Sequence, residues 1–160
     1  MANSWKMNVG VNHAPAYQVS GRPYASGGID ALTPAANGTV LAAGEGVAQK
    51  VAFPYVTRWV VVTNDHVGAG HQTGNNLVAK VAFSQEGILG TEDNYYFNVA
   101  SGSTSGRLEL KVSEIWLSGS NNMSVVAGLT TILPRSVASG SAADPSNGVF
   151  RSWSGSAGVG

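Results

Sequence analysis

The residues best placed to do chemistry are two histidines and a carboxylate near the middle of the chain. Asp65, His66 and His71 fall within the eight residues that begin at Asn64. Imidazole and carboxylate groups together suit zinc and similar ions. Their spacing matches no known ligand pattern, and Asp, Asn and His are also common in solvated turns. A turn is therefore the favoured interpretation, and no metal ligand is assigned.

Paired carboxylates are the second candidate, because glycoside hydrolysis needs two of them on opposite sides of a cleft. Glu92 and Asp93 are adjacent in one predicted loop, with Glu86 nearby, and adjacent loop residues do not by themselves give that separation. The sequence contains no G-x-S-x-G, phosphate-binding loop or H-E-x-x-H, and it contains no cysteine for a thiolate or a disulfide. We therefore predict a protein that is not an enzyme and that needs no cofactor.

The sequence carries unusually little charge. Its nine basic and nine acidic residues cancel, and charged residues make up 11% of the 160 positions, against about 25% in a typical soluble domain. A neutral, charge-poor surface tends to associate, which indicates that other protein chains cover much of it. A carbohydrate-facing β module is the alternative. The chain also lacks the basic surface that nucleic-acid binding requires.

Short stretches of alternating apolar and polar residues, separated by turns rich in Gly, Ser and Asn, predict an all-β protein. In the first of them Gln49 shares a face with Val51 and Phe53. The strand spacing and the long connections predict an antiparallel two-sheet sandwich, in the form of a jelly roll. The clearest stretches are residues 46–53, 56–63, 77–84, 95–99, 107–117 and 123–132.

Two of these strands carry further information. Residues 59–62 are apolar on both faces, which predicts a strand covered on both sides. In residues 107–117 the apolar positions start at Leu108 and Leu110 but change phase by Ile115. Such a slip predicts a β-bulge between Val112 and Glu114.

We divide the chain into an extended N-terminal arm (1–22), a sandwich domain (23–133) and a Gly/Ser-rich C-terminal arm (134–160). No segment has the pattern of a secretory signal or of a membrane span. Aromatic residues interrupt both arms, so we expect the arms to dock on their own or a neighbouring domain, with a disordered tail as the alternative at the C-terminal end. The predicted interface anchors are Trp5, Tyr17, Phe150 and Trp153.

Four segments give the chain a resemblance to a known class of proteins: Phe53–Asn64, Val81–Ser84, Arg107–Leu117 and Trp153–Gly160. Their texture resembles the small jelly-roll virion proteins of tailed bacteriophages and aquatic viruses that decorate or cement capsids. The resemblance extends over most of residues 20–160, and no functional residue carries over from it. It implies a non-enzymatic virion protein, assembled in the host cytoplasm, that forms homo-oligomers, with a trimer favoured. It also implies the major capsid protein or other virion subunits as partners.

The leading hypothesis is therefore a capsid decoration or cement protein that stabilises the head through contacts between subunits, without nucleic-acid or membrane partners. The alternative is a carbohydrate-binding jelly-roll module, either lectin-like or part of a receptor-binding virion component. A hydrolase is the third hypothesis, for which the sequence offers no nucleophile or acid–base pair. The aromatic residues that a sugar site would use lie in or beside strands, where core packing is the usual role: Tyr17, Tyr24, Tyr55, Trp59, Tyr95, Tyr96 and Trp116.

Overall fold

The computed structural model describes residues 21–32, 39–40, 47–66, 77–89 and 95–134. Within these ranges no helix is long and apolar enough to cross a membrane, and the one helix, α1 (Gln85–Leu89), has five residues. The all-β prediction is confirmed. The strands are β1 (Pro23–Ile29), β2 (Thr39–Val40), β3 (Val47–Ala52), β4 (Thr57–Asn64), β5 (Ala79–Ala82), β6 (Tyr96–Val99), β7 (Glu114–Ser118) and β8 (Met123–Leu129).

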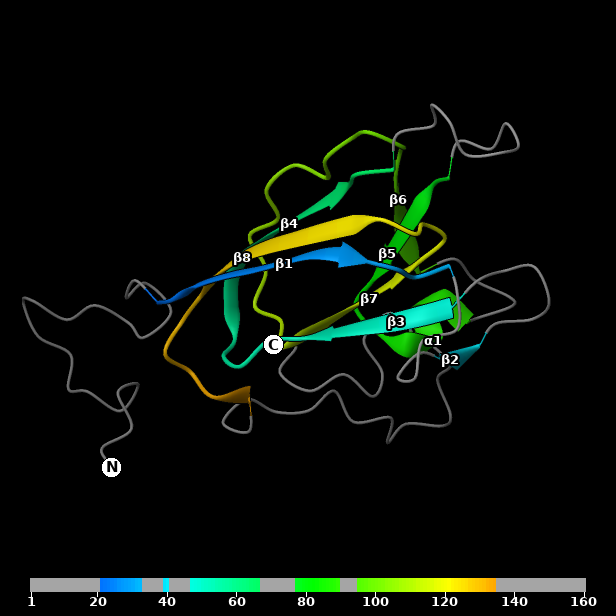
Figure 1. The fold of residues 1–160 in the computed structure, drawn as a ribbon. Coiled ribbons are helices and arrows are strands. Elements are labelled where there is room, and N and C mark those ends of the chain that lie inside the picture. Colours follow the sequence, from blue (N-terminus) through cyan, green and yellow to red (C-terminus); the bar gives the residue numbers. More distant parts are fainter. Residues whose placement is uncertain (1–20, 33–38, 41–46, 67–76, 90–94, 135–160) are drawn as a thin grey trace, which may run out of the picture.

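The strands form two sheets that face each other across one core. One sheet has the order β1-β8-β4, and the other has the order β2-β3-β7-β5-β6. Each of these strand pairs is antiparallel. The helix α1 lies against the five-stranded sheet, on the side away from β1 and β8 (Figure 1). The predicted two-sheet sandwich is therefore confirmed.

The pairing shows how the chain builds this sandwich. β1 pairs with β8, β3 with β7, and β5 with β6. Between them, β4 bonds along its free edge to residues 102–112, where the amides of Val60 and Leu108 each donate to the other's carbonyl at 2.9 Å. The pairs are nested like one long hairpin, and successive pairs alternate between the sheets. A hairpin rolled up in this way gives the predicted jelly roll.

Two segments of the chain pass from one sheet to the other at the same corner. On one segment, β3 ends at Ala52 and β4 begins at Thr57. On the other, the Val112 carbonyl accepts from the Thr57 amide at 2.9 Å, while the next carbonyl, that of Ser113, accepts from the Phe53 amide at 2.8 Å. The predicted bulge is therefore wrong. The change of phase marks the point where residues 107–117 stop pairing with β4 and start pairing with β3. The two sheets face each other, so the side of the segment that points to the core changes when it passes from one sheet to the other.

Thr57 fixes this corner with its side chain. The residue is fully buried, and its hydroxyl donates to the Leu110 carbonyl at 2.7 Å and accepts from the Val112 amide at 3.0 Å. On the other side of β4, the buried hydroxyl of Thr130 donates to the Val56 carbonyl at 2.8 Å. The Thr57 hydroxyl satisfies backbone groups that the bend removes from regular pairing, and a buried backbone group without a partner is costly. The Thr130 hydroxyl adds a second hydrogen bond to the Val56 carbonyl, which also accepts from the Thr130 amide at 2.8 Å.

Asn64 fixes the opposite end of β4. Its fully buried side chain donates through Nδ2 to the carbonyls of Leu77 at 2.8 Å and Val99 at 3.1 Å. Its Oδ1 accepts from the Ser120 hydroxyl at 2.8 Å. One side chain thus joins the end of β4 to the start of β5, the end of β6 and the turn before β8.

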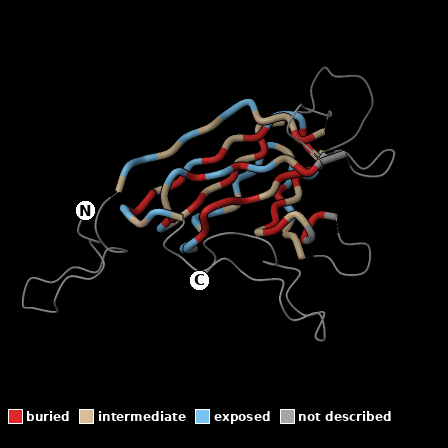
Figure 2. The backbone as a smooth tube through the Cα atoms, turned by 90° about the horizontal axis from the view of Figure 1, so that it is seen from below, coloured by how far each residue is buried: buried red, intermediate tan, exposed pale blue. Residues whose placement is uncertain are grey.

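The buried residues of the two sheets are drawn red in Figure 2. They enclose a core between the sheets that is mainly aliphatic. Val60 and Val62 of β4 contribute to it from one sheet, and Ile115 and Leu117 of β7 contribute from the other. Gln49 pairs with Leu117 on the core side, and its Oε1 is buried. This position confirms the prediction that Gln49 shares a face with core residues of β3.

Replacing Thr57 tests its role at the corner. Thr57→Val keeps the shape but leaves the Leu110 carbonyl and the Val112 amide short of a partner, so we expect the free energy of unfolding to fall by about 2 kcal/mol. Thr63→Val is the matched control on the same strand, because the Thr63 hydroxyl makes an exposed contact with Thr104 at 3.2 Å. It should change stability by no more than about 0.5 kcal/mol. Urea denaturation measures both, and equal losses contradict the assigned role.

Candidate functional site

The histidine and carboxylate cluster is described only at its first residues. The Asp65 carboxylate accepts a hydrogen bond from the Ser124 hydroxyl, and His66 Nδ1 lies 2.9 Å from Asn121 Oδ1. Both contacts join the end of β4 to the region where β8 begins. His71 lies outside the described residues. Within the described ranges, no group of three or more His, Asp or Glu side chains is placed to hold a metal ion.

Most of the two predicted arms lies outside the described residues, which begin at Gly21 and end at Pro134. The roles assigned to the arm residues therefore stay predictions, and the side-chain clusters that the structure describes belong to the sandwich. Outside the described residues lie the four interface anchors Trp5, Tyr17, Phe150 and Trp153, and the loop carboxylates Glu92 and Asp93.

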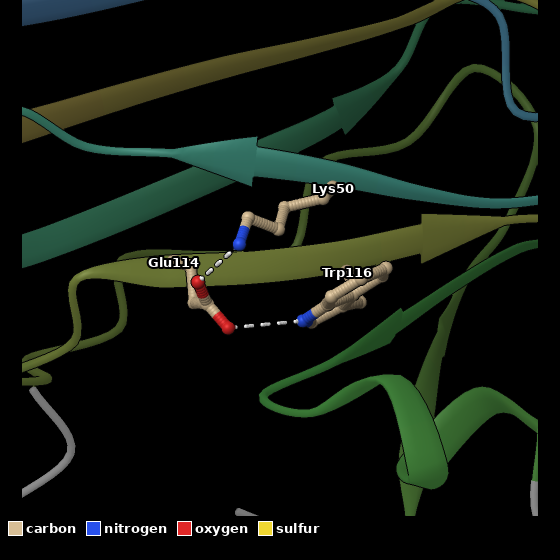
Figure 3. Close-up of polar contacts among 3 residues, drawn as sticks. All are labelled: Lys50, Glu114 and Trp116. Atoms are coloured by element: carbon tan, nitrogen blue, oxygen red, sulfur yellow. Dashed lines mark hydrogen bonds and ion pairs between the residues drawn. The ribbon is translucent and has the colours of Figure 1, made fainter. Parts of the chain in front are cut away.

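Lys50, Glu114 and Trp116 form a polar cluster on the outside of the five-stranded sheet (Figure 3). Lys50 Nζ lies 2.9 Å from Glu114 Oε2, and Trp116 Nε1 donates to Glu114 Oε1 at 3.4 Å. Lys50 Nζ also lies 5.7 Å from the centroid of the Trp116 ring. Because β3 and β7 are neighbours, the cluster connects two strands through their side chains.

This cluster is better suited to stability than to catalysis. A general acid or base needs a free position from which to reach a proton of the substrate, whereas both oxygens of Glu114 already bind side chains of the protein. The same side of the sheet is also covered in part by α1, whose Ile88 packs with Ala48 and Ala82 against Tyr96 and Trp116. We therefore interpret the cluster as a set of cross-strand contacts that stabilises the pairing of β3 with β7.

Mainly apolar side chains lie on the outside of the three-stranded sheet, and no described helix or strand packs over them. The strand register places Trp59 beside Gly128, Val61 beside Val126, and Val126 beside Ala25. None of these side chains is buried in the core, and Val126 is 42% exposed. We use the name outer face for the six uncharged residues Pro23, Ala25, Trp59, Val61, Val126 and Gly128.

Trp59 supplies the largest side chain of the outer face. Its indole lies over Gly128, where an added Cβ would come within 2.3 Å of Trp59 Nε1, so only glycine leaves room for the ring. The Arg107 guanidinium lies 5.2 Å from the ring centroid and is paired with Glu109 at 2.7 Å. Gly128 on one side and the Arg107 guanidinium on the other fix the position of the Trp59 indole.

The outer face explains why residues 59–62 of β4, predicted to be covered on both sides, are apolar on both sides. Val60 and Val62 do face the core, but Trp59 and Val61 lie half-buried on the other side. The described part of the chain supplies a covering layer for only one side of β4. The sequence did not reveal that Ala25 and Val126 join this surface, because their positions depend on pairing between distant strands.

Replacing Lys50 and Glu114 separately tests whether their contact stabilises the pairing of β3 with β7. The Glu114 side chain is only 10% exposed, so Lys50→Met leaves a largely buried carboxylate without its cation. The Lys50 side chain is 44% exposed, so in Glu114→Gln the ammonium can turn to water. We expect Lys50→Met to lower the free energy of unfolding by about 2–3 kcal/mol and Glu114→Gln by about 1 kcal/mol. Chemical denaturation at neutral pH compares them. A larger loss for Glu114→Gln would show that the partially buried carboxylate does not depend on Lys50.

Comparison with other proteins gives no family for this chain. No protein-family model matches it, and neither the curated proteins nor the solved structures give a significant match. The function must therefore be inferred from the sandwich and its surfaces.

Proposed function

We propose that this protein is a non-enzymatic structural subunit that acts by assembly, most concretely as a virion protein that decorates or cements a capsid. The observation that carries the proposal is the outer face. It is an uncharged, mainly apolar surface that extends across three paired strands. Single apolar side chains on a surface are ordinary, whereas a contiguous apolar patch marks a site of interaction.

The low charge of the whole chain supports the same proposal. A protein that works as a free monomer usually carries many charges on its surface, and those charges keep it apart from its copies. This chain has nine basic and nine acidic residues among 160, and none of them belongs to the outer face. Contact through the outer face itself desolvates no charged group. At its border Arg107 lies over Trp59 and is already paired with Glu109.

The size of a stable contact explains why the proposal includes the arms. Specific interfaces bury about 1,200–2,000 Å² in total, which is more than six residues of one sheet can supply. In the proposed assembly the arms extend the contact to neighbouring subunits through Trp5 and Tyr17 at one end and Phe150 and Trp153 at the other. The proposed partners are further copies of this chain, as a homotrimer, and the major capsid protein of the virion.

A carbohydrate-binding module is the second candidate, because Trp59 and Trp116 both lie half-buried outside the core. An indole in that position can stack on a sugar ring. Each ring already has a cation of the protein over it, Arg107 in one case and Lys50 in the other, which leaves less of its surface for a ligand. Saturable binding of a neutral glycan to the isolated protein would support this candidate over assembly.

Replacing Val126 tests assembly through the outer face. Val126→Asp puts a charge in the centre of the face, and we expect it to reduce the solution mass toward that of one 16.4 kDa chain, because the carboxylate would be desolvated in the contact. Val78→Asp is the matched control, since Val78 is 41% exposed and Val126 is 42% exposed. Val78 precedes β5 in the other sheet, so this variant should keep the mass of the wild type.

Light scattering measures the masses, and circular dichroism checks that both variants stay folded. A wild-type protein with the mass of a single chain at every concentration contradicts assembly. An unchanged mass for Val126→Asp contradicts the outer face as its site.

A further inference from the structure

A pocket adjoins the outer face where β1 begins. It has a volume of about 260 Å³, and its lining includes Arg22, Arg58, Trp59 and Gly128. Ligand pockets for drug-sized molecules are commonly 300–1,000 Å³. This pocket is therefore of a size to take one side chain or a similar small group.

The pocket concentrates positive charge in a protein that has little. The chain contains nine Lys and Arg residues in total, and two of them, Arg22 and Arg58, line this one pocket. No Asp or Glu is among its described lining residues. A third arginine, Arg107, lies over the Trp59 ring, but it is paired with Glu109 at 2.7 Å. The described lining residues therefore carry a net positive charge.

The donors in the wall suit a carboxylate. A guanidinium has five N–H donors in a planar fork that matches the two oxygens of a carboxylate, so it can hold one partner and still bind another. The Trp59 indole adds a further N–H beside Gly128, and this group has no acceptor among the described residues. A carboxylate in the pocket would meet charged and neutral donors together.

We propose that this pocket binds the side-chain carboxylate of an Asp or Glu on the protein that covers the outer face. The inference rests on the proposed assembly function, because the pocket shares Trp59 and Gly128 with that face. An apolar, uncharged sheet gives contact area but little information about orientation. One charge-assisted contact at its edge fixes how the partner sits, since charged groups contribute specificity more than affinity.

Nuclear magnetic resonance of the full chain tests the pocket with a defined probe, N-acetylglutamate methylamide. The Trp59 indole signal, assigned by its loss in Trp59→Phe, should shift saturably with millimolar affinity. The neutral glutamine analogue should leave the signal in place. Raising the salt from about 0.05 to 0.5 M should weaken the binding, because salt screens charges near the surface.

Three variants that each remove one positive charge separate the pocket from a general charge effect. Arg22→Gln and Arg58→Gln should weaken binding of the glutamate probe by about tenfold or more, the loss expected for one charge-assisted contact. Lys80→Gln is the matched control and should bind like the wild type, because Lys80 lies over Tyr96 on the other sheet.

Three results overturn the pocket. They are no shift of the Trp59 indole up to roughly 100 mM probe, where even a weak site fills, equal binding by the three variants, and binding of glucuronate without binding of the glutamate probe. The last result would assign the pocket to an acidic sugar.

Light scattering of the same samples tests assembly separately. Carboxylate binding by a protein that never self-associates overturns the proposed assembly and leaves the pocket standing. Assembly without carboxylate binding does the reverse.

Discussion

The fold depends on buried polar side chains that hold both ends of β4. At one end Thr57 bonds across the corner to Leu110 and Val112, and at the other Asn64 bonds to Leu77 and to further loop groups. Since β4 also lies between β8 and residues 102–112, it is restrained along its edges as well as at its ends. Two segments of the chain cross between the sheets at the Thr57 corner, so the backbone itself connects the sheets there, in addition to their packing across the core.

A strand held in this way has a fixed division of its side chains. Val60 and Val62 are committed to the core, and the period-two alternation of a strand then places Trp59 and Val61 on the outside. The apolar character of both sides of β4 follows from two separate demands, one from folding and one from the proposed contact. Trp59 serves both demands. It packs over Gly128 of the neighbouring strand, and it also borders the arginine-lined pocket.

The sequence was sufficient for the fold class because alternation is a local property, as the placement of Gln49 on the core side shows. It was misleading at residues 107–117, where a change of phase can mean either a bulge or a passage between sheets. Only the partners of Val112 and Ser113 distinguish the two. Asn64 resembled an ordinary turn residue because burial cannot be read from a polar side chain. The outer face and the pocket bring Arg22 and Ala25, at the start of β1, together with Val126 of β8, about 100 residues later in the chain, and no local pattern records that.

The nested pairing also has a consequence for how this sandwich connects to other chains. β1 and β8 are antiparallel neighbours, and the Leu129 amide donates to the Arg22 carbonyl at 3.0 Å. The described chain therefore enters and leaves the sandwich side by side. A domain with adjacent entry and exit points can be inserted into a surface loop of a host protein without stretching it. Because the pocket is lined by Gly21, Arg22 and Leu129, it would then lie where the sandwich joins its host.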